Sequence, residues 1–379
     1  MLDASRGQSR RACRVLLVGG GTGGHISPLL AIAEALRETN PDVRLHFIGG
    51  RRGSEGSLVP EAGIPFHAVP MASLRDPQSR VALLGTLVGL PLAFFDALFQ
   101  MLRQRPSVLM TSGGAIAIPV VIAARVLRVP VYLWAGDALP GRASRTLSRF
   151  CARIGVTFEQ ATRSFPPRKA VLTGTPIRAS LLRWTREAAR KKMDVPEDAT
   201  LIVVTGGSQG SARINEAISS ALPQLLAKAY VLHVTGESHI GKANAREKTL
   251  GDDVRSRYLP RPYLRDEMGA VLAASDLVVG RAGASSISEP LAFGVPLVLV
   301  PFGAAMEGHQ EMNARATSEV GAAVVVRESQ LPDRLVVEVS GLLNDRARLA
   351  RMAESARKAG RPNAAKDIAR SLLELGGCA

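Results

Sequence analysis

Three short segments rich in glycine and hydroxyl residues carry the most distinctive chemistry in this sequence. Each follows a run of apolar residues: 19–25 follows 15–18, 206–211 follows 201–204, and 280–289 follows 277–279. A glycine turn between a strand and a helix exposes backbone N–H groups at the positive end of the helix, which favours phosphate binding. Such turns also occur for tight packing alone, so each segment by itself leaves both interpretations open.

Two side chains in these segments could act on a substrate. His25 stands where the first glycine turn becomes a helix. A neutral imidazole there could take a proton from an attacking hydroxyl, or it could merely bond the backbone. Glu289 could accept hydrogen bonds from both hydroxyls of a ribose, or it could be a favourable acid near a helix start.

Several other chemistries find no support in the sequence. No G-x-x-x-x-G-K-[ST] motif occurs, and the first glycine segment lacks the G-x-G-x-x-G spacing of dinucleotide sites. No D-x-D motif occurs, so we expect no metal ion, and helix starts and basic side chains would stabilise a departing diphosphate. Cys13, Cys151 and Cys378 lie far apart, which indicates neither a disulfide framework nor a metal site and favours a reducing compartment.

The elements that must position these segments alternate between strands and helices. Strands are predicted at 15–18, 45–48, 108–111, 129–133, 201–204, 231–234, 277–279 and 295–300. This alternation predicts an α/β fold with two doubly wound, Rossmann-like domains and a cleft between them. We expect domains at 1–184 and 197–361, a linker in the charged stretch 185–200, and a final helix within 362–379 that could cross back to the first domain. The first helix is predicted to have Ser27 as its cap and Pro28 in its first turn.

The charge is strongly positive and unevenly distributed. The formal net charge is +15, and residues 1–180 hold 22 Lys and Arg against 10 Asp and Glu. A positive field suits nucleic acid, anionic lipid or a phosphorylated substrate. Only 4% of the residues are aromatic, and no nucleic-acid-binding motif occurs, so nucleic acid is the weakest of these partners.

Residues 81–102 form one long apolar stretch. Its length would suit a transmembrane helix, but Pro91, Asp96 and the predicted strand at 108 disfavour a span. We expect a helix that packs one face on its domain and inserts another shallowly into a membrane interface; a fully buried helix is the alternative. Arg142, Arg145, Arg149 and Arg153 are spaced for one helix face, which could meet anionic lipid or only water.

Four motifs together resemble the MurG family of UDP-N-acetylglucosamine transferases, which make the lipid-linked disaccharide of peptidoglycan. They are 20–25 (GGTGGH), 206–211 (GGSQGS), 281–289 (RAGASSISE), and His309-Gln310 with Asn313. They occur in the family's order, and the resemblance extends from about residue 14 to 321.

The resemblance implies a GT-B fold and the inverting transfer of N-acetylglucosamine from UDP-N-acetylglucosamine to the 4-hydroxyl of a muramyl peptide on undecaprenyl diphosphate. It implies no cofactor, and a peripheral position on the cytoplasmic side of the cell membrane beside anionic lipids. Another GT-B glycolipid transferase, a UDP-N-acetylglucosamine epimerase and a non-catalytic sensor of UDP-sugar remain alternatives.

The resemblance also assigns site residues. Gly21, Gly113 and Gly114 would face the acceptor diphosphate, and His25 would be the base. The donor would contact Thr22, Gly23, Gly24, Asp137, Arg178, Ser208, Gln209, Leu264, Ala284, Ser285, Ser286, Ile287, Ser288, Glu289 and Gln310.

One segment departs from the family pattern. The family usually has His-Glu-Gln-Asn before Ala-x-Pro-Gly, whereas residues 134–141 here read Trp-Ala-Gly-Asp-Ala-Leu-Pro-Gly. Asp137 therefore replaces an amide donor with a carboxylate acceptor, which leaves the donor sugar open. A buried carboxylate can have a raised pKa, so Asp137 is a second candidate for the base.

Overall fold

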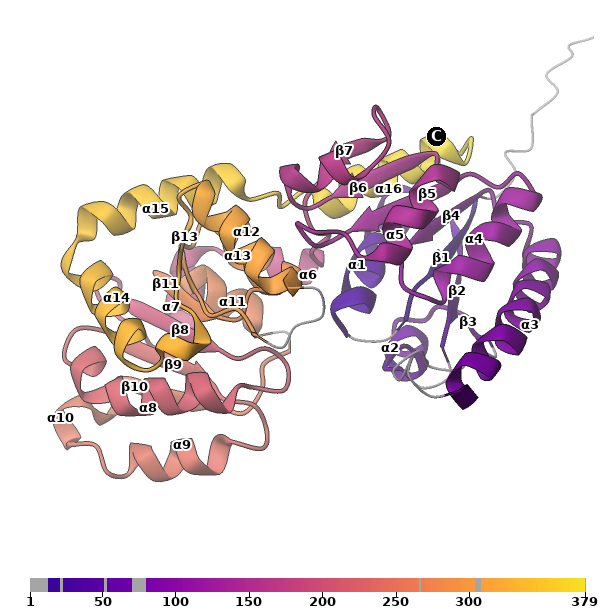
Figure 1. The fold of residues 1–379 in the computed structure, drawn as a ribbon. Coiled ribbons are helices and arrows are strands. Elements are labelled where there is room, and N and C mark those ends of the chain that lie inside the picture. Colours follow the sequence, from indigo (N-terminus) through magenta and orange to yellow (C-terminus); the bar gives the residue numbers. More distant parts are fainter. Residues whose placement is uncertain are drawn as a thin grey trace, which may run out of the picture.

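The computed structural model describes residues 13–20, 23–50, 53–69, 80–265, 267–303 and 308–378, with the backbone alone for 23, 25 and 80–88. Two lobes lie side by side, one formed by the first half of the chain and one by the second (Figure 1). This arrangement confirms the predicted fold class of two Rossmann-like domains with parallel sheets.

The N-terminal domain is built on a seven-stranded, all-parallel sheet with the order β3-β2-β1-β4-β5-β6-β7. Its central strands are mostly apolar and are buried along almost their whole length, because helices cover both faces of the sheet. The strands are β1 (Arg14–Val18), β2 (Arg44–Gly49), β3 (Phe66–Ala68), β4 (Val108–Thr111), β5 (Val131–Ala135), β6 (Arg153–Val156) and β7 (Ala170–Leu172).

The helices of this domain begin close to the strand ends. They are α1 (Gly23–Thr39), α2 (Glu55–Glu61), α3 (Arg80–Gln104), α4 (Ala117–Val126) and α5 (Arg142–Leu147), with short 3-10 turns η1 (Ser148–Phe150) and η2 (Glu159–Ser164). The predicted Ser27 cap is wrong because α1 begins at the glycine turn itself, which places Ser27 and Pro28 inside the helix.

The predicted arginine helix face is also wrong. Helix α5 ends at Leu147, and the chain then turns through η1 into β6. Arg153 therefore starts a strand, where its guanidinium bonds Ser371 and lies 3.2 Å from the Glu374 carboxylate. Arg142, Arg145 and Arg149 remain on the exposed surface.

Helix α3 lies along the outer side of the N-terminal domain (Figure 1). Ala93, Ala97 and Met101 pack into the core, and the Asp96 carboxylate accepts a hydrogen bond of 2.8 Å from His67 on β3. The opposite face of α3 exposes large apolar side chains, so the fully buried alternative is wrong for residues 89–104. Among the described helices, none is long and apolar enough to cross a membrane.

The C-terminal domain has a six-stranded parallel sheet with the order β10-β9-β8-β11-β12-β13. Its strands are β8 (Leu201–Thr205), β9 (Tyr230–Val234), β10 (Tyr258–Arg261), β11 (Leu277–Gly280), β12 (Leu297–Leu299) and β13 (Ala323–Val325). The covering helices are α8 (Ala212–Leu226), α9 (Ile240–Glu247), α10 (Asp252–Arg255), α11 (Met268–Ala274), α12 (Ala284–Ala292), α13 (His309–Glu319), η4 (Glu328–Gln330), α14 (Asp333–Asn344) and α15 (Arg346–Ala359).

The charged stretch expected to be a linker is structured. Residues 186–193 form α7 (Arg186–Met193), which packs on α11 of the C-terminal domain. Arg190 on α7 is almost fully buried and lies 2.7 Å from the Asp276 carboxylate. The chain therefore passes between the domains before α7, through the short helix α6 (Ala179–Leu182).

The final helix, α16 (Ala364–Leu375), returns to the N-terminal domain and packs on α1 (Figure 1). Its apolar face, with Ile368 and Leu372, joins the same core cluster as Leu29 and Ile32. This return brings Cys378 to the start of β1, where it forms a disulfide with Cys13. The expectation of no disulfide is therefore wrong, because sequence distance did not reveal that the two ends meet.

Helix α16 should contribute strongly to the stability of the N-terminal domain. Ile368→Ala removes a fully buried side chain and leaves a cavity, so we expect a loss of about 2–5 kcal/mol in the free energy of unfolding. Urea unfolding followed by circular dichroism measures the loss. Arg370→Ala, on the exposed side of the same helix, should change stability by less than about 0.5 kcal/mol. Equal losses in the two variants would contradict this packing.

Candidate active site

The sheet topology gathers the predicted site segments at two edges. In the N-terminal domain, β1, β4 and β5 are neighbours, so the loops that follow them lie at one edge. In the C-terminal domain, β8, β11 and β12 are neighbours, so residues 206–211, 281–283 and 300–303 also share an edge. Ligands of doubly wound folds bind at such carboxyl edges.

Asn313 on α13 holds the two edges against each other. Its side chain is fully buried, and its Oδ1 accepts a hydrogen bond of 2.7 Å from the Ala138 amide of the N-terminal domain. Its Nδ2 donates to Asp137 Oδ1 at 2.9 Å and to the Ala282 carbonyl at 3.1 Å. One turn earlier, His309 Nδ1 donates to the Leu139 carbonyl at 2.8 Å. Helix α13 is therefore fixed to the 137–139 loop.

Asp137 lies at this contact and is only partly buried. One carboxylate oxygen accepts from Asn313, and the other lies 3.9 Å from His309 Nδ1. An asparagine in this position could make the same bond with Asn313 through its oxygen and would keep an amide donor for a ligand. Asp137 instead offers a second acceptor.

Trp134 and Gly136 depart from the family pattern as a pair. The Trp134 indole donates a buried hydrogen bond of 3.0 Å to the Gly174 carbonyl. A Cβ atom at Gly136 would lie 2.7 Å from the Trp134 ring. The indole therefore occupies the space that a longer side chain at position 136 would need.

The glycine loop 206–211 leads directly into α8. Gly207 and Gly210 have φ values of +86° and +76°, and a Cβ at Gly210 would collide with the Thr235 carbonyl. Ser208 and Gln209 are exposed at the tip of the loop. The loop therefore presents open backbone at the start of α8, which is the arrangement expected for an anion.

A buried polar network supports this loop from behind. Asn215 Nδ2 donates to the Thr235 carbonyl at 2.9 Å, so its Oδ1 lies 3.0 Å from His233 Nε2 and accepts a hydrogen bond from the Nε2–H group. His233 Nδ1 then accepts from the Tyr258 hydroxyl at 2.9 Å. Burial lowers the pKa of His233 to about 4, so the ring is neutral at physiological pH. The network fixes Thr235, against which Gly210 packs.

Helix α12 presents Glu289 in its second turn. Burial raises the pKa of Glu289 to about 7, although the positive charge of Arg178 opposes the shift. Arg178 precedes α6 on the interdomain connection, so the structure brings these two predicted donor residues together. The side chains of Ile287 and Leu264 are instead buried in the domain core. Only the backbone of those two residues is available to a ligand.

Gln310 and Arg281 organise the loops around α12. Gln310 Oε1 accepts hydrogen bonds from the backbone amides of Ala282 and Phe302, at 3.3 and 3.0 Å. Arg281 Nη2 donates to Ser211 Oγ at 2.7 Å and pairs with Glu328 at 2.6 Å. Sequence reasoning gave Arg281 and Asn313 no role; the spacing of Asn313 four residues after His309 could have indicated a shared helix face.

In the N-terminal domain, Gly113 and Gly114 form an open turn before α4. Their φ values are +83° and +81°, and the Gly113 amide donates to Thr111 Oγ1 at 3.0 Å. Among the described residues other than its chain neighbours, no atom lies within 4 Å of a Cβ built on Gly114, and the residue is exposed. Gly23, Gly24 and His25 form the first turn of α1. Gly21, Thr22 and the side chain of His25 lie outside the described residues.

Comparison with known proteins agrees with this geometry. The glycosyltransferase family 28 N-terminal domain matches residues 15–156, and the glycosyltransferase family 28 C-terminal domain matches residues 201–368. The chain belongs to glycosyltransferase family 28. Its site loops lie within the two matched domains of that family.

Similar proteins match nearly the whole chain. A UDP-N-acetylglucosamine--N-acetylmuramyl-(pentapeptide) pyrophosphoryl-undecaprenol N-acetylglucosamine transferase from Desulforudis audaxviator is 38% identical, covering 96% of this chain and 99% of its own. A protein with the same name from Salinibacter ruber is 39% identical, and the match covers 97% of this chain and 98% of the relative. The crystal structure of Acinetobacter baumannii MurG matches with a TM-score of 0.76 and 25% identity. The match covers 96% of this chain and 99% of the MurG chain.

The fold is also shared more widely. A UDP-GlcNAc 2-epimerase from Neisseria meningitidis bound to UDP-GlcNAc has a TM-score of 0.64 at 14% identity, covering 95% of this chain and 100% of its own. At this identity, the likeness concerns the fold alone.

Because the pKa of Glu289 is raised, the free energy of unfolding should depend on pH. An unfolded glutamate ionises near pH 4.5, whereas folded Glu289 ionises near pH 7. Between these values the unfolded chain holds fewer protons, so rising pH should destabilise the native protein relative to Glu289→Gln. We expect the difference to grow from near zero at pH 4 to at most about 3 kcal/mol at pH 8.

Urea unfolding of both proteins across this pH range measures the effect. Glu354→Gln is a suitable control, because a hydrogen bond and the charge of Lys358 lower the pKa of exposed Glu354. A constant stability difference between native protein and Glu289→Gln from pH 4 to 8 would contradict the burial of this carboxyl group.

Proposed function

We propose that this chain transfers N-acetylglucosamine from UDP-N-acetylglucosamine to the 4-hydroxyl of a muramyl peptide on undecaprenyl diphosphate. The observation that carries the proposal is the full-length similarity to transferases named for this reaction, at 34–39% identity. The open glycine loops on facing sheet edges supply the anion sites that such a reaction needs. The product enters peptidoglycan synthesis.

The donor lies on the C-terminal domain in this proposal. The UDP diphosphate rests on the exposed backbone of Ser208 and Gln209 at the start of α8, and Arg178 adds positive charge. Glu289 accepts hydrogen bonds from the ribose hydroxyls. Gln310 directs its amide nitrogen to the sugar, because its oxygen already accepts two backbone hydrogen bonds.

The remaining donor contacts come from α12 and the loop after β10. Small residues at the start of α12 allow the uridine to approach the backbone, and the loop after β10 offers a backbone contact to uracil. These contacts involve Ala284, Ser285, Ser286, Ile287, Ser288 and Leu264, with Thr22, Gly23, Gly24 and Asp137 completing the site from the opposite domain. Gly21, Gly113 and Gly114 face the acceptor diphosphate.

The reaction is a direct displacement. The acceptor 4-oxygen forms a bond to the anomeric carbon, the bond from that carbon to the phosphate oxygen breaks, and UDP leaves with the electron pair. His25, in the first turn of α1, takes the hydroxyl proton. The loop 206–211 and Arg178 stabilise the charge that develops on UDP. Asn313 holds the Asp137 carboxylate in place, and that carboxylate orients the substrates by accepting hydrogen bonds from them.

A transfer assay tests the proposed function. Purified protein is incubated with labelled UDP-N-acetylglucosamine and the undecaprenyl-diphospho-muramyl pentapeptide, with and without chelator. We expect a labelled lipid-linked disaccharide at equal rates in both conditions, because helix starts and cations neutralise the leaving group. Absence of labelled lipid, when a MurG enzyme labels it in parallel, would overturn the proposal.

Two variants separate the candidate bases. His25→Ala should lower kcat by about 10²–10⁴-fold, the usual contribution of a general base. Asp137→Asn should retain activity within about tenfold, because an amide can still accept from Asn313 and gains a donor toward the sugar. Steady-state kinetics of both variants measure these changes. The opposite result, in which Asp137→Asn loses about 10²–10⁴-fold in kcat and His25→Ala stays near the native rate, would identify Asp137 as the base.

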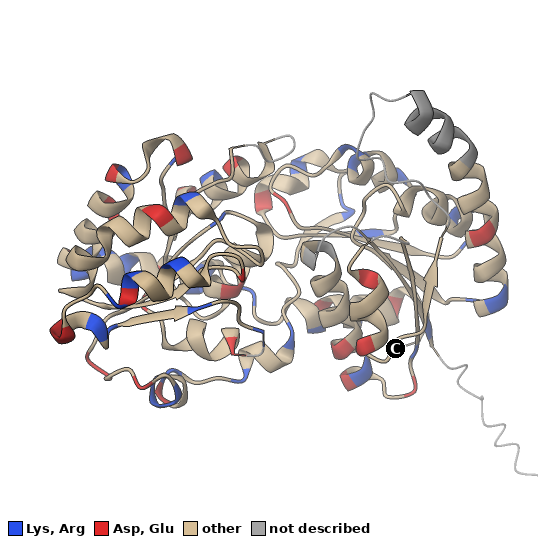
Figure 2. Ribbon diagram, turned by 90° about the horizontal axis from the view of Figure 1, so that it is seen from below, with Lys and Arg blue, Asp and Glu red and all other residues tan. Residues whose placement is uncertain are grey.

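We also propose that the protein lies peripherally on the cytoplasmic side of the membrane, and the exposed face of α3 supports contact with the bilayer. Phe95 and Phe99 are 64% and 61% exposed, with Leu92 and Leu102 on the same stripe. Most of the described part of α3 carries no charge (Figure 2). Exposed Arg103 and Arg125 lie on α3 and the neighbouring α4, where anionic headgroups could meet them. We call Leu92, Phe95, Phe99 and Leu102 the α3 stripe.

The α3 stripe should govern vesicle binding. Phe95→Ser with Phe99→Ser should reduce cosedimentation with vesicles containing phosphatidylglycerol by about tenfold or more, because the bound protein then inserts two fewer phenyl groups into the bilayer. Val337→Ser, at a 61% exposed apolar residue of the C-terminal domain, serves as the control and should bind like the native protein. Equal binding by all three proteins would contradict membrane contact through α3.

A further inference from the structure

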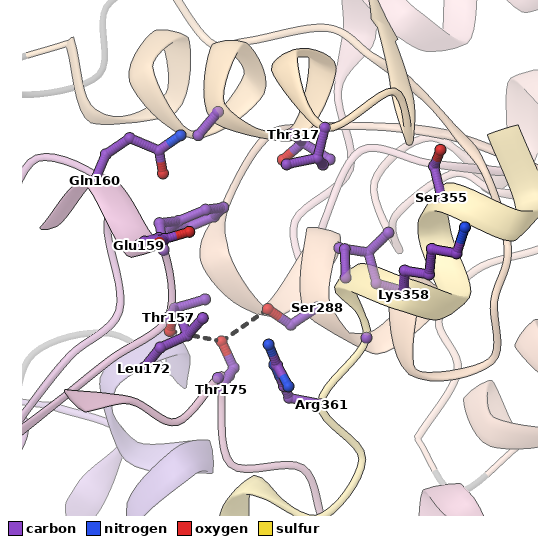
Figure 3. Close-up of a pocket in the computed structure, with 17 residues that line it drawn as sticks. Thr157, Glu159, Gln160, Leu172, Thr175, Ser288, Thr317, Ser355, Lys358 and Arg361 are labelled. Carbon is purple, nitrogen blue, oxygen red and sulfur yellow. Dashed lines mark hydrogen bonds between the residues drawn. The ribbon is translucent and has the colours of Figure 1, made fainter. Parts of the chain in front are cut away.

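A cavity lies between the domains and is lined in part by α12 and α13. Its volume is about 280 Å³, and both domains line it. The N-terminal domain contributes Phe158 and Leu172, and the C-terminal domain contributes Leu291, Val320 and Lys358. Figure 3 shows this cavity, which we call the hinge pocket because it is bordered by Gly174, shortly before the first interdomain crossing, and by Arg361, at the second.

A chain of hydroxyl groups forms one wall of the hinge pocket. Thr175 Oγ1 lies 3.0 Å from Thr157 Oγ1 and 2.8 Å from Ser288 Oγ (Figure 3). This chain connects the end of β6 to α12, which also carries Glu289. Successive helix residues point about 100° apart, so Ser288 and Glu289 lie on different faces of α12. The hinge pocket and the proposed ribose contact therefore use different faces of one helix.

The same wall carries positive charge. Arg361 packs across Gly174. A Cβ atom added at Gly174 would collide with the Cβ of Arg361. Its side chain points toward the hydroxyls of Thr175 and Ser288 (Figure 3), and among the described residues no carboxylate pairs with it. Lys358 pairs with Glu354, but this exposed bridge is weak and screened by salt. Glu159 lies on the opposite side of the pocket from Lys358 (Figure 3).

The rest of the lining combines apolar side chains with the polar residues Gln160, Thr317 and Ser355. Phe158 and Leu291 are buried at its sides, whereas Leu172 and Val320 are exposed at the rim. The volume falls near the lower end of ligand pockets, so only a small molecule fits. We propose that the hinge pocket binds a small amphipathic anion, with a carboxylate or phosphate on Arg361 and the hydroxyls, and an apolar body between Phe158, Leu291 and Val320.

Such a ligand would be coupled to the donor. Both domains line the hinge pocket, so its shape depends on the angle between them. A ligand that fits one angle favours that angle, and through α12 it changes the affinity for UDP; UDP must change the affinity for the ligand by the same factor. This coupling rests on the proposed donor site, whereas the proposal that the hinge pocket binds an anion does not depend on that site.

The probe is 8-anilinonaphthalene-1-sulfonate, which carries an anionic group on an apolar body and fluoresces when bound. The full chain carries Phe95→Ser and Phe99→Ser, so that the α3 stripe does not take up the probe. We expect saturable binding that Arg361→Gln weakens by about tenfold, since a charged hydrogen bond is lost. Val320→Trp, which fills the rim, should also weaken it. Arg370→Gln, at an exposed arginine of α16, is the matched control and should leave it unchanged.

The titration is repeated with saturating UDP, whose own binding is measured by calorimetry. A change of about fivefold or more in probe affinity supports the coupling. Equal affinity in the parent and Arg361→Gln proteins overturns the hinge pocket as an anion site. Unchanged probe affinity when UDP is bound overturns the coupling alone. Failure of UDP to bind contradicts the proposed donor site. The hinge pocket is then still tested by probe binding to the parent and Arg361→Gln proteins, which does not depend on UDP.

Discussion

The buried amide of Asn313 is the contact on which the arrangement of the site depends. An amide has both an acceptor and donors, so one side chain can satisfy Ala138 and Asp137 in one domain and Ala282 in the other. Loss of that side chain would leave buried polar groups without partners, which is costly in a water-free contact. The hydrogen bonds thus hold α13, and with it Gln310, against the loop that follows β5.

The glycine loops have a complementary requirement, which is open backbone on a rigid support. Gly207 and Gly114 supply φ values that other residues rarely adopt, and among the described residues no atom beyond their chain neighbours lies within 4 Å of a Cβ built on either. Rigidity comes from elsewhere: the neutral His233 network fixes the carbonyl against which Gly210 packs, and Arg281 ties Ser211 to Glu328. A loop held in this way can bind an anion without reorganising at the moment of reaction.

The two domains divide the surface into three regions with different chemistry. The cleft edges carry open backbone and titratable groups, the outer side of the N-terminal domain carries the apolar α3 stripe, and the hinge pocket combines hydroxyls with Arg361. Helix α12 contributes to two of these regions, because Glu289 faces Arg178 while Ser288 bonds Thr175. A shift of α12 would therefore affect both the cleft and the hinge pocket.

The sequence by itself determined the alternation of strands and helices, the two glycine turns and the family, because these depend on local periodicity and residue order. It also predicted Glu289 and Arg178 as donor contacts, although not that the two side chains lie near each other. Tertiary structure alone decided that 186–193 packs as α7, that Arg153 starts a strand, and that Cys13 meets Cys378. It also decided that Asn313 joins the domains. Each of these depends on contacts between segments far apart in the chain, and local sequence patterns do not encode which distant segments meet.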